Sequence, residues 1–284
     1  MLGFKRLIAL VGALSSLVIG CAAMAAEAGH PLDWQLGFQS SVTSVMDEIE
    51  LFHSYLLYLI TAIAGFVLLL LLIVIVRFNA RSNPTPSRTT HNTLLEVLWT
   101  MVPVLILVTI AIPSFRLLFF QLNTPAADLT VKATGEQWYW TYSYPDNGNF
   151  QFDSLLVRDE AKLRPDQPRL LGVDNEMVVP VNKVVRVLTT GNDVIHSFAV
   201  PSFGIKIDAI PGRINETWFK ADREGLYYGQ CSELCGRDHA FMPIAVRVVS
   251  EQAFNDWLNE AKQKWARDES APSSVAAVDP VTSR

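Results

Sequence analysis

The stretch Tyr228-Gly-Gln-Cys-Ser-Glu-Leu-Cys-Gly-Arg-Asp-His-Ala-Phe-Met242 gathers four side chains that bind soft metals. Cys231 and Cys235 offer thiolates, His239 offers an imidazole and Met242 a thioether. Zinc sites usually pair Cys-x2-Cys with further Cys or His and rarely use a thioether. The combination found here favours copper, and a single-copper electron-transfer site uses only one Cys. The stretch therefore predicts two metal ions that share both sulfurs as bridges.

A disulfide between Cys231 and Cys235 is the alternative, because disulfides persist outside the cytoplasm, where we expect this part of the chain. The distribution of soft ligands argues against a purely structural bond. Beyond residue 120 the chain has two Cys, two His and two Met, and this single loop holds both Cys, one His and one Met. A disulfide alone leaves that clustering unexplained.

The composition and the N-terminus indicate an exported membrane protein. The chain has 284 residues, of which 50% are hydrophobic, and a mean hydropathy of +0.24, too apolar for an ordinary soluble protein. We expect residues 1–25 to form a signal peptide, with Lys5 and Arg6 before an apolar run and small residues up to Ala25. A third membrane helix is the alternative, but the run is short. Cys21 also fits a lipoprotein signal, so its lipidation stays open.

Two later apolar runs are long enough to span a bilayer core of about 30 Å. We expect transmembrane helices over residues 55–76 and 94–118, and Pro103 in the second predicts a kink. Buried core helices are the alternative, but a polar linker between two such runs favours two spans. That linker, residues 77–93, has three Arg and no Asp or Glu, so it is cytoplasmic by the positive-inside rule. The lead-in, residues 26–54, is then periplasmic.

Residues 128–262 have the short alternating apolar runs and turn signals of an all-β domain, and the pattern favours a sandwich or a barrel. A terminal helix is expected over Phe254–Arg267, and residues 268–284 have the composition of a disordered tail. The predicted strands are Leu129–Ala133, Gln137–Tyr144, Phe150–Val157, Arg169–Val173, Met177–Val179, Val184–Thr189, Glu216–Phe219 and Ile244–Val249.

From about Leu36 to about Leu258 the chain resembles subunit II of cytochrome c oxidase, in the bacterial, CuA-containing form. Four ordered motifs carry the resemblance: Gly135-Glu-Gln-Trp-Tyr-Trp-Thr-Tyr142, Asp193-Val-Ile-His-Ser-Phe-Ala-Val-Pro-Ser202, Asp208-Ala-Ile-Pro-Gly-Arg213 and Tyr227-Tyr-Gly-Gln-Cys-Ser-Glu-Leu-Cys-Gly236. The resemblance implies a mixed fold, a two-helix transmembrane hairpin followed by an all-β cupredoxin-like barrel. The chain has no Cys-x-x-Cys-His haem motif, so the forms with a fused cytochrome c domain are excluded.

The resemblance also implies the cofactors and partners. Cys231 and Cys235 would bridge the two coppers of a CuA centre, with His196 and Met242 on one copper, and His239 and the Glu233 carbonyl on the other. The Glu233 side chain would bind Mg²⁺ (or Mn²⁺) at the interface with subunit I, although a solvated loop carboxylate is equally common. The implied partners are subunits I and III, cytochrome c and the lipid bilayer; no nucleic acid is expected.

Three further roles follow from the resemblance. Trp138 would accept the electron from cytochrome c, although core aromatics are the common alternative for this Trp-Tyr-Trp segment. Asp174 and Asp193 match acidic docking residues, whereas Ser143 replaces one and Glu136 stands where many members have His. Glu96, at the cytoplasmic end of the second span, would lie at the entrance of a proton path; contact with lipid headgroups is the alternative.

The part of the chain after residue 120 is weakly acidic, and its residues also bear on two rival functions. From residue 121 onward the chain has 22 Asp and Glu against 17 Lys and Arg, an acidic excess that suits a basic cytochrome c but is common elsewhere. A quinol-oxidase subunit II lacks the copper ligands that this chain has. A membrane-tethered copper-delivery protein needs neither Trp138 nor Glu96.

Overall fold

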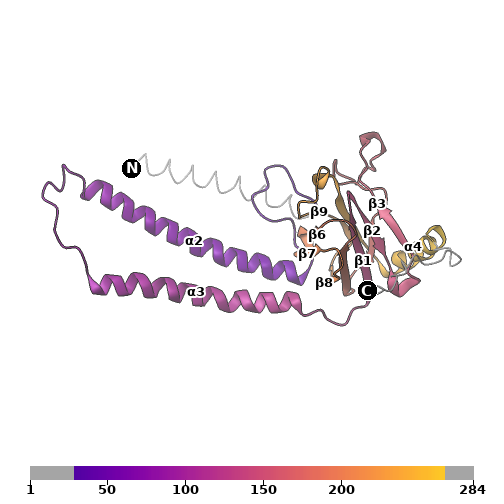
Figure 1. Ribbon diagram of the computed structural model, residues 1–284, viewed down its shortest axis with the longest axis horizontal. Helices are drawn as coiled ribbons and strands as arrows, with labels where there is room; N and C mark the ends of the chain where they lie inside the picture. Colours follow the sequence, from indigo (N-terminus) through magenta and orange to yellow (C-terminus); the bar gives the residue numbers. More distant parts are fainter. Residues whose placement is uncertain (1–28, 266–284) are drawn as a thin grey trace, which may run out of the picture.

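The computed structural model describes residues 29–265, which form a helical hairpin and a β-sandwich (Figure 1). The predicted signal peptide and tail, and the end of the predicted helix Phe254–Arg267, lie outside these residues. Helices α2 (Ser44–Arg77) and α3 (Thr93–Leu122) run side by side, and the linker between them lies at the end of the hairpin far from the sandwich.

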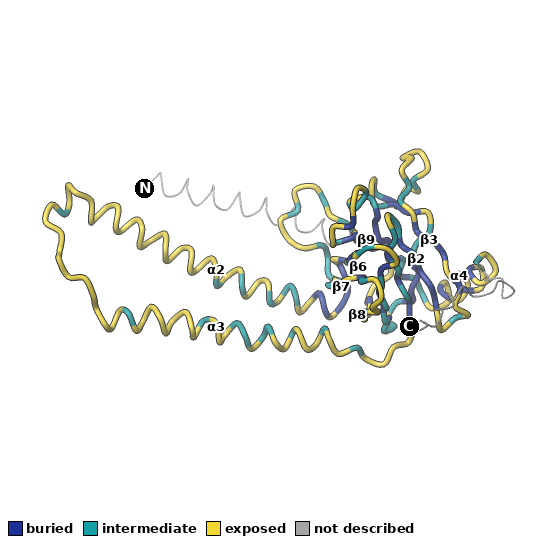
Figure 2. The backbone as a smooth tube through the Cα atoms, viewed as in Figure 1, coloured by how far each residue is buried: buried dark blue, intermediate teal, exposed yellow. Residues whose placement is uncertain are grey.

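Both helices begin at side chains that accept a hydrogen bond from the first turn. The Thr43 hydroxyl accepts from the Met46 N–H, and the Asn92 side chain accepts from the Leu95 N–H. The most apolar windows of α2 and α3 have mean hydropathies of 3.3 and 2.3, and their residues are exposed along the hairpin (Figure 2). Exposed apolar helices of this length suit a bilayer. Helix α3 continues through Pro103 and Pro113, so Pro103 does not divide it.

The sandwich consists of two five-stranded sheets, with strand orders β3-β2-β1-β5-β8 and β4-β10-β9-β6-β7. The sheets are mixed, because β1 pairs with β5, and β4 with β10, in parallel. The strands are β1 (Leu129–Glu136), β2 (Tyr139–Ser143), β3 (Gln151–Ser154), β4 (Met177–Pro180), β5 (Val185–Gly191), β6 (His196–Val200), β7 (Ile205–Ala209), β8 (Asn215–Phe219), β9 (Gly225–Cys231) and β10 (Pro243–Val249).

The core lies between the two sheets and follows the alternation of the strands. In β5 every second residue is buried, as the period of a strand requires. Trp140 and Tyr142 of β2 face Phe198 of β6 and neighbouring apolar residues in one continuous cluster. Helix α4 (Glu251–Lys264) closes one end of this cluster with Phe254, Leu258 and Ala261. The expected cupredoxin-like, all-β domain is therefore confirmed.

Seven of the predicted strands overlap observed ones, and one is wrong. Residues 169–173 form turns, and only Val173 makes an isolated bridge, to Leu156. Strands β6, β7 and β9 were not predicted. Strand β9 contains two glycines and β6 begins with a buried His and Ser, so neither shows a clean alternation. Strand β7 does alternate, so its signal was present in the sequence.

Both helices are fixed to the sandwich at their periplasmic ends. The Thr43 hydroxyl donates to the Phe203 carbonyl at 2.8 Å, and the Val42 N–H donates to the Ser202 carbonyl at 3.2 Å. At the end of α3 the Trp218 indole N–H donates to the Gln121 carbonyl at 3.1 Å. The hairpin is therefore bound to the domain by polar contacts at the ends of both helices, and the contact at Thr43 is buried.

Candidate metal centre

Three strand ends and one loop bring the predicted ligands together. His196 is the first residue of β6, Cys231 the last of β9, and Met242 directly precedes β10. The loop after β9 carries Cys235 and leads into the short helix η5 (His239–Phe241). Strands β6 and β9 approach closely at Gly229, where a Cβ would lie 1.8 Å from the Ala199 carbonyl oxygen. Glycine at that position thus allows the two ligand-bearing strands to pair.

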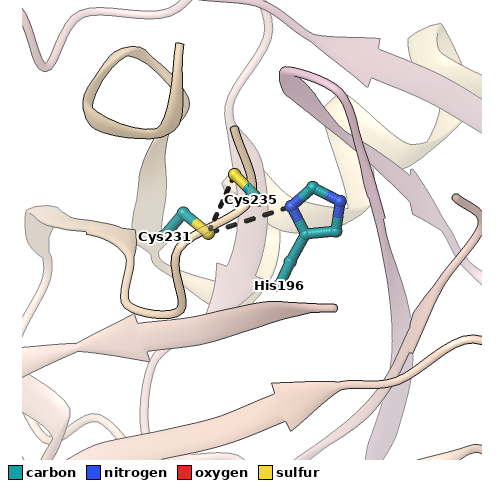
Figure 3. A group of neighbouring side chains, drawn as sticks. All are labelled: His196, Cys231 and Cys235. Atoms are coloured by element: carbon teal, nitrogen blue, oxygen red, sulfur yellow. Dashed lines mark hydrogen bonds between the residues drawn. The ribbon is translucent and has the colours of Figure 1, made fainter. Parts of the chain in front are cut away.

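The donor atoms converge on the two sulfurs. His196, Cys231 and Cys235 have ligand atoms that all lie within 4.8 Å of one another, and the imidazole of His196 faces the Cys231 sulfur (Figure 3). The His196 Nδ1 lies 3.8 Å from the Cys231 Sγ. On the other sulfur, the Cys235 Sγ lies 3.5 Å from both the His239 Nδ1 and the Met242 Sδ. The structure thus gathers every side-chain ligand that the sequence predicted.

The backbone supplies one more oxygen. The Glu233 carbonyl oxygen lies 3.3 Å from the Cys231 Sγ, whereas the Glu233 side chain is exposed. This carbonyl can complete a set of soft donors around the sulfurs, and the carboxylate stays available to a hard cation at the surface.

The two cysteines are free and buried, with their Sγ atoms 3.9 Å apart. Burial opposes ionisation of Cys231, but hydrogen bonds with His196 and backbone groups lower its pKa. Burial and the neighbouring Cys231 raise the pKa of Cys235. Metals bind cysteine as the thiolate, so a cation that binds both sulfurs displaces any proton that they carry.

His196 is held by a carboxylate on the side away from the sulfurs. Its Nε2 lies 2.8 Å from the Asp193 Oδ1, which leaves Nδ1 toward Cys231. Burial raises the pKa of Asp193, but the hydrogen bonds from His196, Val194 and Gln137 outweigh it and lower that pKa overall. A carboxylate that orients a metal-binding imidazole is a common outer-shell arrangement. The sequence prediction gave Asp193 only a docking role and missed this contact.

Trp138 lies at the edge of the centre. Trp140 and Tyr142 are fully buried in β2, whereas Trp138 precedes the strand and is half-buried. Its indole N–H donates to the Cys235 carbonyl at 3.2 Å, and the Arg237 guanidinium lies 5.3 Å from the centre of its ring. Trp138 therefore connects the surface to a ligand residue directly.

Three other predicted residues lie outside this cluster. The exposed Asp174 accepts hydrogen bonds from the Leu155 and Asn175 N–H groups, each at 2.7 Å. Glu96 is in the first turn of α3, at the far end of the hairpin (Figure 1). Ser143, which replaces an acid, is buried with 8% of its surface exposed, so it offers little to a docking partner.

Comparisons with known proteins agree with this arrangement. The family model for the periplasmic domain of cytochrome c oxidase subunit II matches residues 129–249, and that for its transmembrane domain matches residues 31–117. A probable cytochrome c oxidase subunit 2 of Rickettsia bellii is 53% identical over 244 residues, covering 86% of this chain and 90% of the relative. Cytochrome c oxidase subunit 2 of Cereibacter sphaeroides is 46% identical over 251 residues, covering 82% of each.

One solved structure covers the β domain. The periplasmic domain of subunit II of cytochrome oxidase of Bradyrhizobium japonicum is 68% identical and covers 51% of this chain and 100% of that one, with a TM-score of 0.48.

Proposed function

This chain belongs to the family of cytochrome c oxidase subunit II, and we propose that it is the subunit through which cytochrome c supplies electrons to the oxidase. As a member of that family it is a subunit of a haem-copper oxidase, and its partners are the other oxidase subunits. It crosses the bacterial inner membrane twice and holds its β domain in the periplasm.

The donor set of the centre suits a two-copper CuA group. Two thiolates, two imidazole nitrogens and a thioether are soft or borderline ligands, and all of them lie around the Cys231 and Cys235 sulfurs. Two sulfurs at 3.9 Å, each with its own neighbouring His, fit a pair of ions that would share both sulfurs. This convergence is the single observation that carries the proposal. When bound, the group supplies one-electron transfer and no bond chemistry.

The residues of the chain hold the centre rigid and dry. His196, Cys231, Cys235 and Met242 are each at most 6% exposed, and all but Cys235 lie at or next to the end of a strand. Asp193 orients His196. A rigid, water-poor site changes little between oxidation states, and that lowers the cost of moving an electron.

Electrons would arrive at Trp138 and leave toward subunit I. The indole of Trp138 is half-buried and shares a hydrogen bond with the Cys235 carbonyl, so an electron accepted there is one contact from a ligand. We assign Asp174 and Asp193 to the docking of cytochrome c. We assign the exposed carboxylate of Glu233 to a Mg²⁺ (or Mn²⁺) shared with subunit I, and Glu96 to a proton path that serves oxygen reduction and proton pumping.

We propose domain limits on the same basis. Residues 1–25 form a signal peptide, residues 55–76 and 94–118 lie within the bilayer, residues 77–93 are cytoplasmic, and residues 128–262 form the CuA domain. Helices α2 and α3 extend beyond both proposed spans, which supports a hairpin whose ends reach into water.

Purification of the oxidase with wild-type, Cys231→Ser and Met242→Leu chains tests the proposal. The wild-type complex should contain a haem-bearing large subunit and show the absorption of a two-copper centre. Cys231→Ser should lose this absorption and turnover with cytochrome c, because a hydroxyl cannot replace a bridging thiolate. Met242→Leu should keep most of the copper and shift its reduction potential.

Met177→Leu is the matched control, since Met177 is equally buried but lies in β4 among core residues. It should leave the copper absorption unchanged. A Cys231→Ser complex that keeps two coppers and near-normal turnover contradicts the CuA assignment. A purified chain that binds copper without any large subunit favours the copper-delivery alternative.

A further inference from the structure

The end of β1 and the turn that leads to β2, residues 135–138, contact both parts of the metal centre. On one side the backbone of this segment supports the ring of His196: a Cβ on Gly135 would lie 2.7 Å from the Cγ and Cδ2 atoms of that imidazole. At position 135 only glycine leaves room for the His196 imidazole as it lies here. The segment therefore sets where His196 lies within the sandwich.

Gln137 is bonded to both ligand-bearing parts of the chain. Its backbone N–H donates to the Asp193 Oδ2 at 2.7 Å, and the other oxygen of that carboxylate binds His196. Its side-chain amide donates to the Cys235 carbonyl at 2.8 Å. One residue thus joins the carboxylate that orients His196 to the loop that carries Cys235.

Arg158 attaches the later part of the loop by donating to the Asp238 carboxylate at 3.2 Å, but the part before Cys235 has few attachments. Among the hydrogen bonds of the described residues, Ser232 donates to the Ser197 carbonyl, and the next bond from the loop to another part of the domain is at the Cys235 carbonyl. That carbonyl receives two donors, Gln137 Nε2 and Trp138 Nε1. Gly236 follows with φ of +121°, and a Cβ there would lie 3.0 Å from Trp138 Cζ2 and 3.1 Å from Gln137 Nε2. Glycine lets the loop approach both donors.

From these contacts we infer that Gln137 is a positioning residue, which holds the Cys235 loop against His196 before any metal binds. A loop that is already ordered loses less conformational freedom on binding, so a fixed carbonyl favours metal uptake and one ligand geometry. The inference goes beyond the proposed function. Only the part of its test that measures copper rests on that function.

The test uses the full-length chain in detergent, first without metal. Amide hydrogen exchange is followed for peptides that cover residues 232–242 in wild type, Gln137→Ala and Gln137→Glu. Both variants lose the amide donor, and Gln137→Glu keeps the length of the side chain. A net hydrogen bond corresponds to roughly a three- to tenfold change in an opening equilibrium, so exchange in this loop should accelerate by about that factor.

Gln263→Ala is the control, because Gln263 is an exposed glutamine on α4. It should leave exchange in the loop unchanged. Exchange in β1, β5 and β10 should be the same in all variants, which shows that the sandwich stays folded. Loop exchange that is equal in wild type, Gln137→Ala and Gln137→Glu overturns the positioning role.

A second arm examines the assembled oxidase. Loss of copper to a chelator should be faster in Gln137→Ala by a similar factor, and the copper hyperfine splitting should change, since the ligand geometry is less well defined. Unchanged hyperfine splitting and unchanged copper loss also count against the inference. If the wild-type oxidase contains no two-copper centre, the proposed function fails, whereas the exchange experiment still decides whether Gln137 orders the loop.

Discussion

The indole of Trp138 combines three features that no neighbouring aromatic residue shares together. It is half-buried, it donates to the Cys235 carbonyl, and a guanidinium lies over its ring. Trp138→Gln should slow electron transfer from cytochrome c far more than it weakens cytochrome binding, because the aromatic acceptor is lost. Trp138→Phe keeps a ring without the N–H and should be intermediate.

Rapid mixing with reduced cytochrome c, with binding measured separately, checks this prediction. The control is Trp257→Phe, since Trp257 is packed on α4 away from the ligands. A Trp138→Gln oxidase with the wild-type transfer rate would return Trp138 to a purely structural role.

Asp166 makes the stability of the domain depend on pH in the acidic range. A hydrogen bond from Arg247 at 2.7 Å is the largest influence on this carboxyl, and it lowers the pKa of Asp166. Because the folded pKa is below the unfolded one, the stabilisation is present above the unfolded pKa of about 4. It is lost as the pH falls through the folded pKa.

In Asp166→Asn the free energy of unfolding should therefore fall less steeply with pH below about pH 4. At pH 7 it should change by less than about 1 kcal/mol, because solvent screens the Asp166–Arg247 pair. Guanidinium unfolding of the chain in detergent over a pH series measures it. Asp256→Asn, on the exposed side of α4, is the control. An Asp166→Asn curve parallel to wild type at low pH contradicts the assignment.

Among the elements, α2 has one residue that contributes both to its start and to its attachment. The buried Thr43 hydroxyl accepts from the Met46 N–H and donates to the Phe203 carbonyl. Thr43→Val removes both bonds at similar volume and should destabilise the junction by about 1–3 kcal/mol. Proteolysis near residues 40–46 should become faster.

Thr61→Val is the matched control, because Thr61 lies in the exposed middle of α2. Limited proteolysis of the assembled oxidase and of the isolated full chain provides the measurement. Equal cleavage of Thr43→Val and wild type in the isolated chain shows that other contacts suffice to hold α2.

Much of the element pattern could be read from the sequence, and the failures have local causes. The hairpin has uninterrupted apolar runs, and β5 alternates strictly, so both were predictable. Residues 169–173 look apolar enough for a strand, but they turn back on themselves, because the Leu171 and Gly172 N–H groups both donate to the Pro168 carbonyl. Strands β6 and β9 carry ligands at their ends, and the residues there show no regular alternation of apolar and polar side chains.

The centre itself was predictable because its ligands are rare and cluster in sequence. Cys231, Cys235, His239 and Met242 lie within twelve residues, and His196 is the only other His after residue 120. The supporting contacts were not predictable from residue type. Gln137 acts through a backbone N–H and a bond to a carbonyl, and common residues in such roles leave no compositional signal.

Across the whole molecule, Glu96 is in the first turn of α3, at the end of the hairpin far from the sandwich that holds the metal centre (Figure 1). Helix α3 begins beside Glu96 and its 30 residues correspond to about 45 Å before the chain enters the sandwich. If Glu96 supplies protons as proposed, Glu96→Ala should slow steady-state oxygen reduction. It should leave the copper absorption and the rate of electron uptake from cytochrome c unchanged.

Turnover over a pH series, with the copper spectrum recorded on the same samples, tests this separation. Glu224→Ala removes an exposed carboxylate from the periplasmic domain and serves as the control. Glu96 stands in the first turn of α3, where a negative charge also stabilises a helix. Unaltered turnover in Glu96→Ala at every pH would leave Glu96 with that structural role alone.

The bonds that fix α2 and α3 to the sandwich also affect how a donor finds the centre. A domain on loose linkers tumbles independently, so collisions sample every orientation of both partners. Here the contacts at Thr43 and Trp218 restrict the rotation of the domain relative to the bilayer. Orientation normally reduces association from the diffusion limit to roughly 10⁵–10⁷ M⁻¹s⁻¹. Because the domain keeps one orientation relative to the bilayer, only the electron donor has to reorient. Part of the orientational search is therefore complete before the two proteins collide.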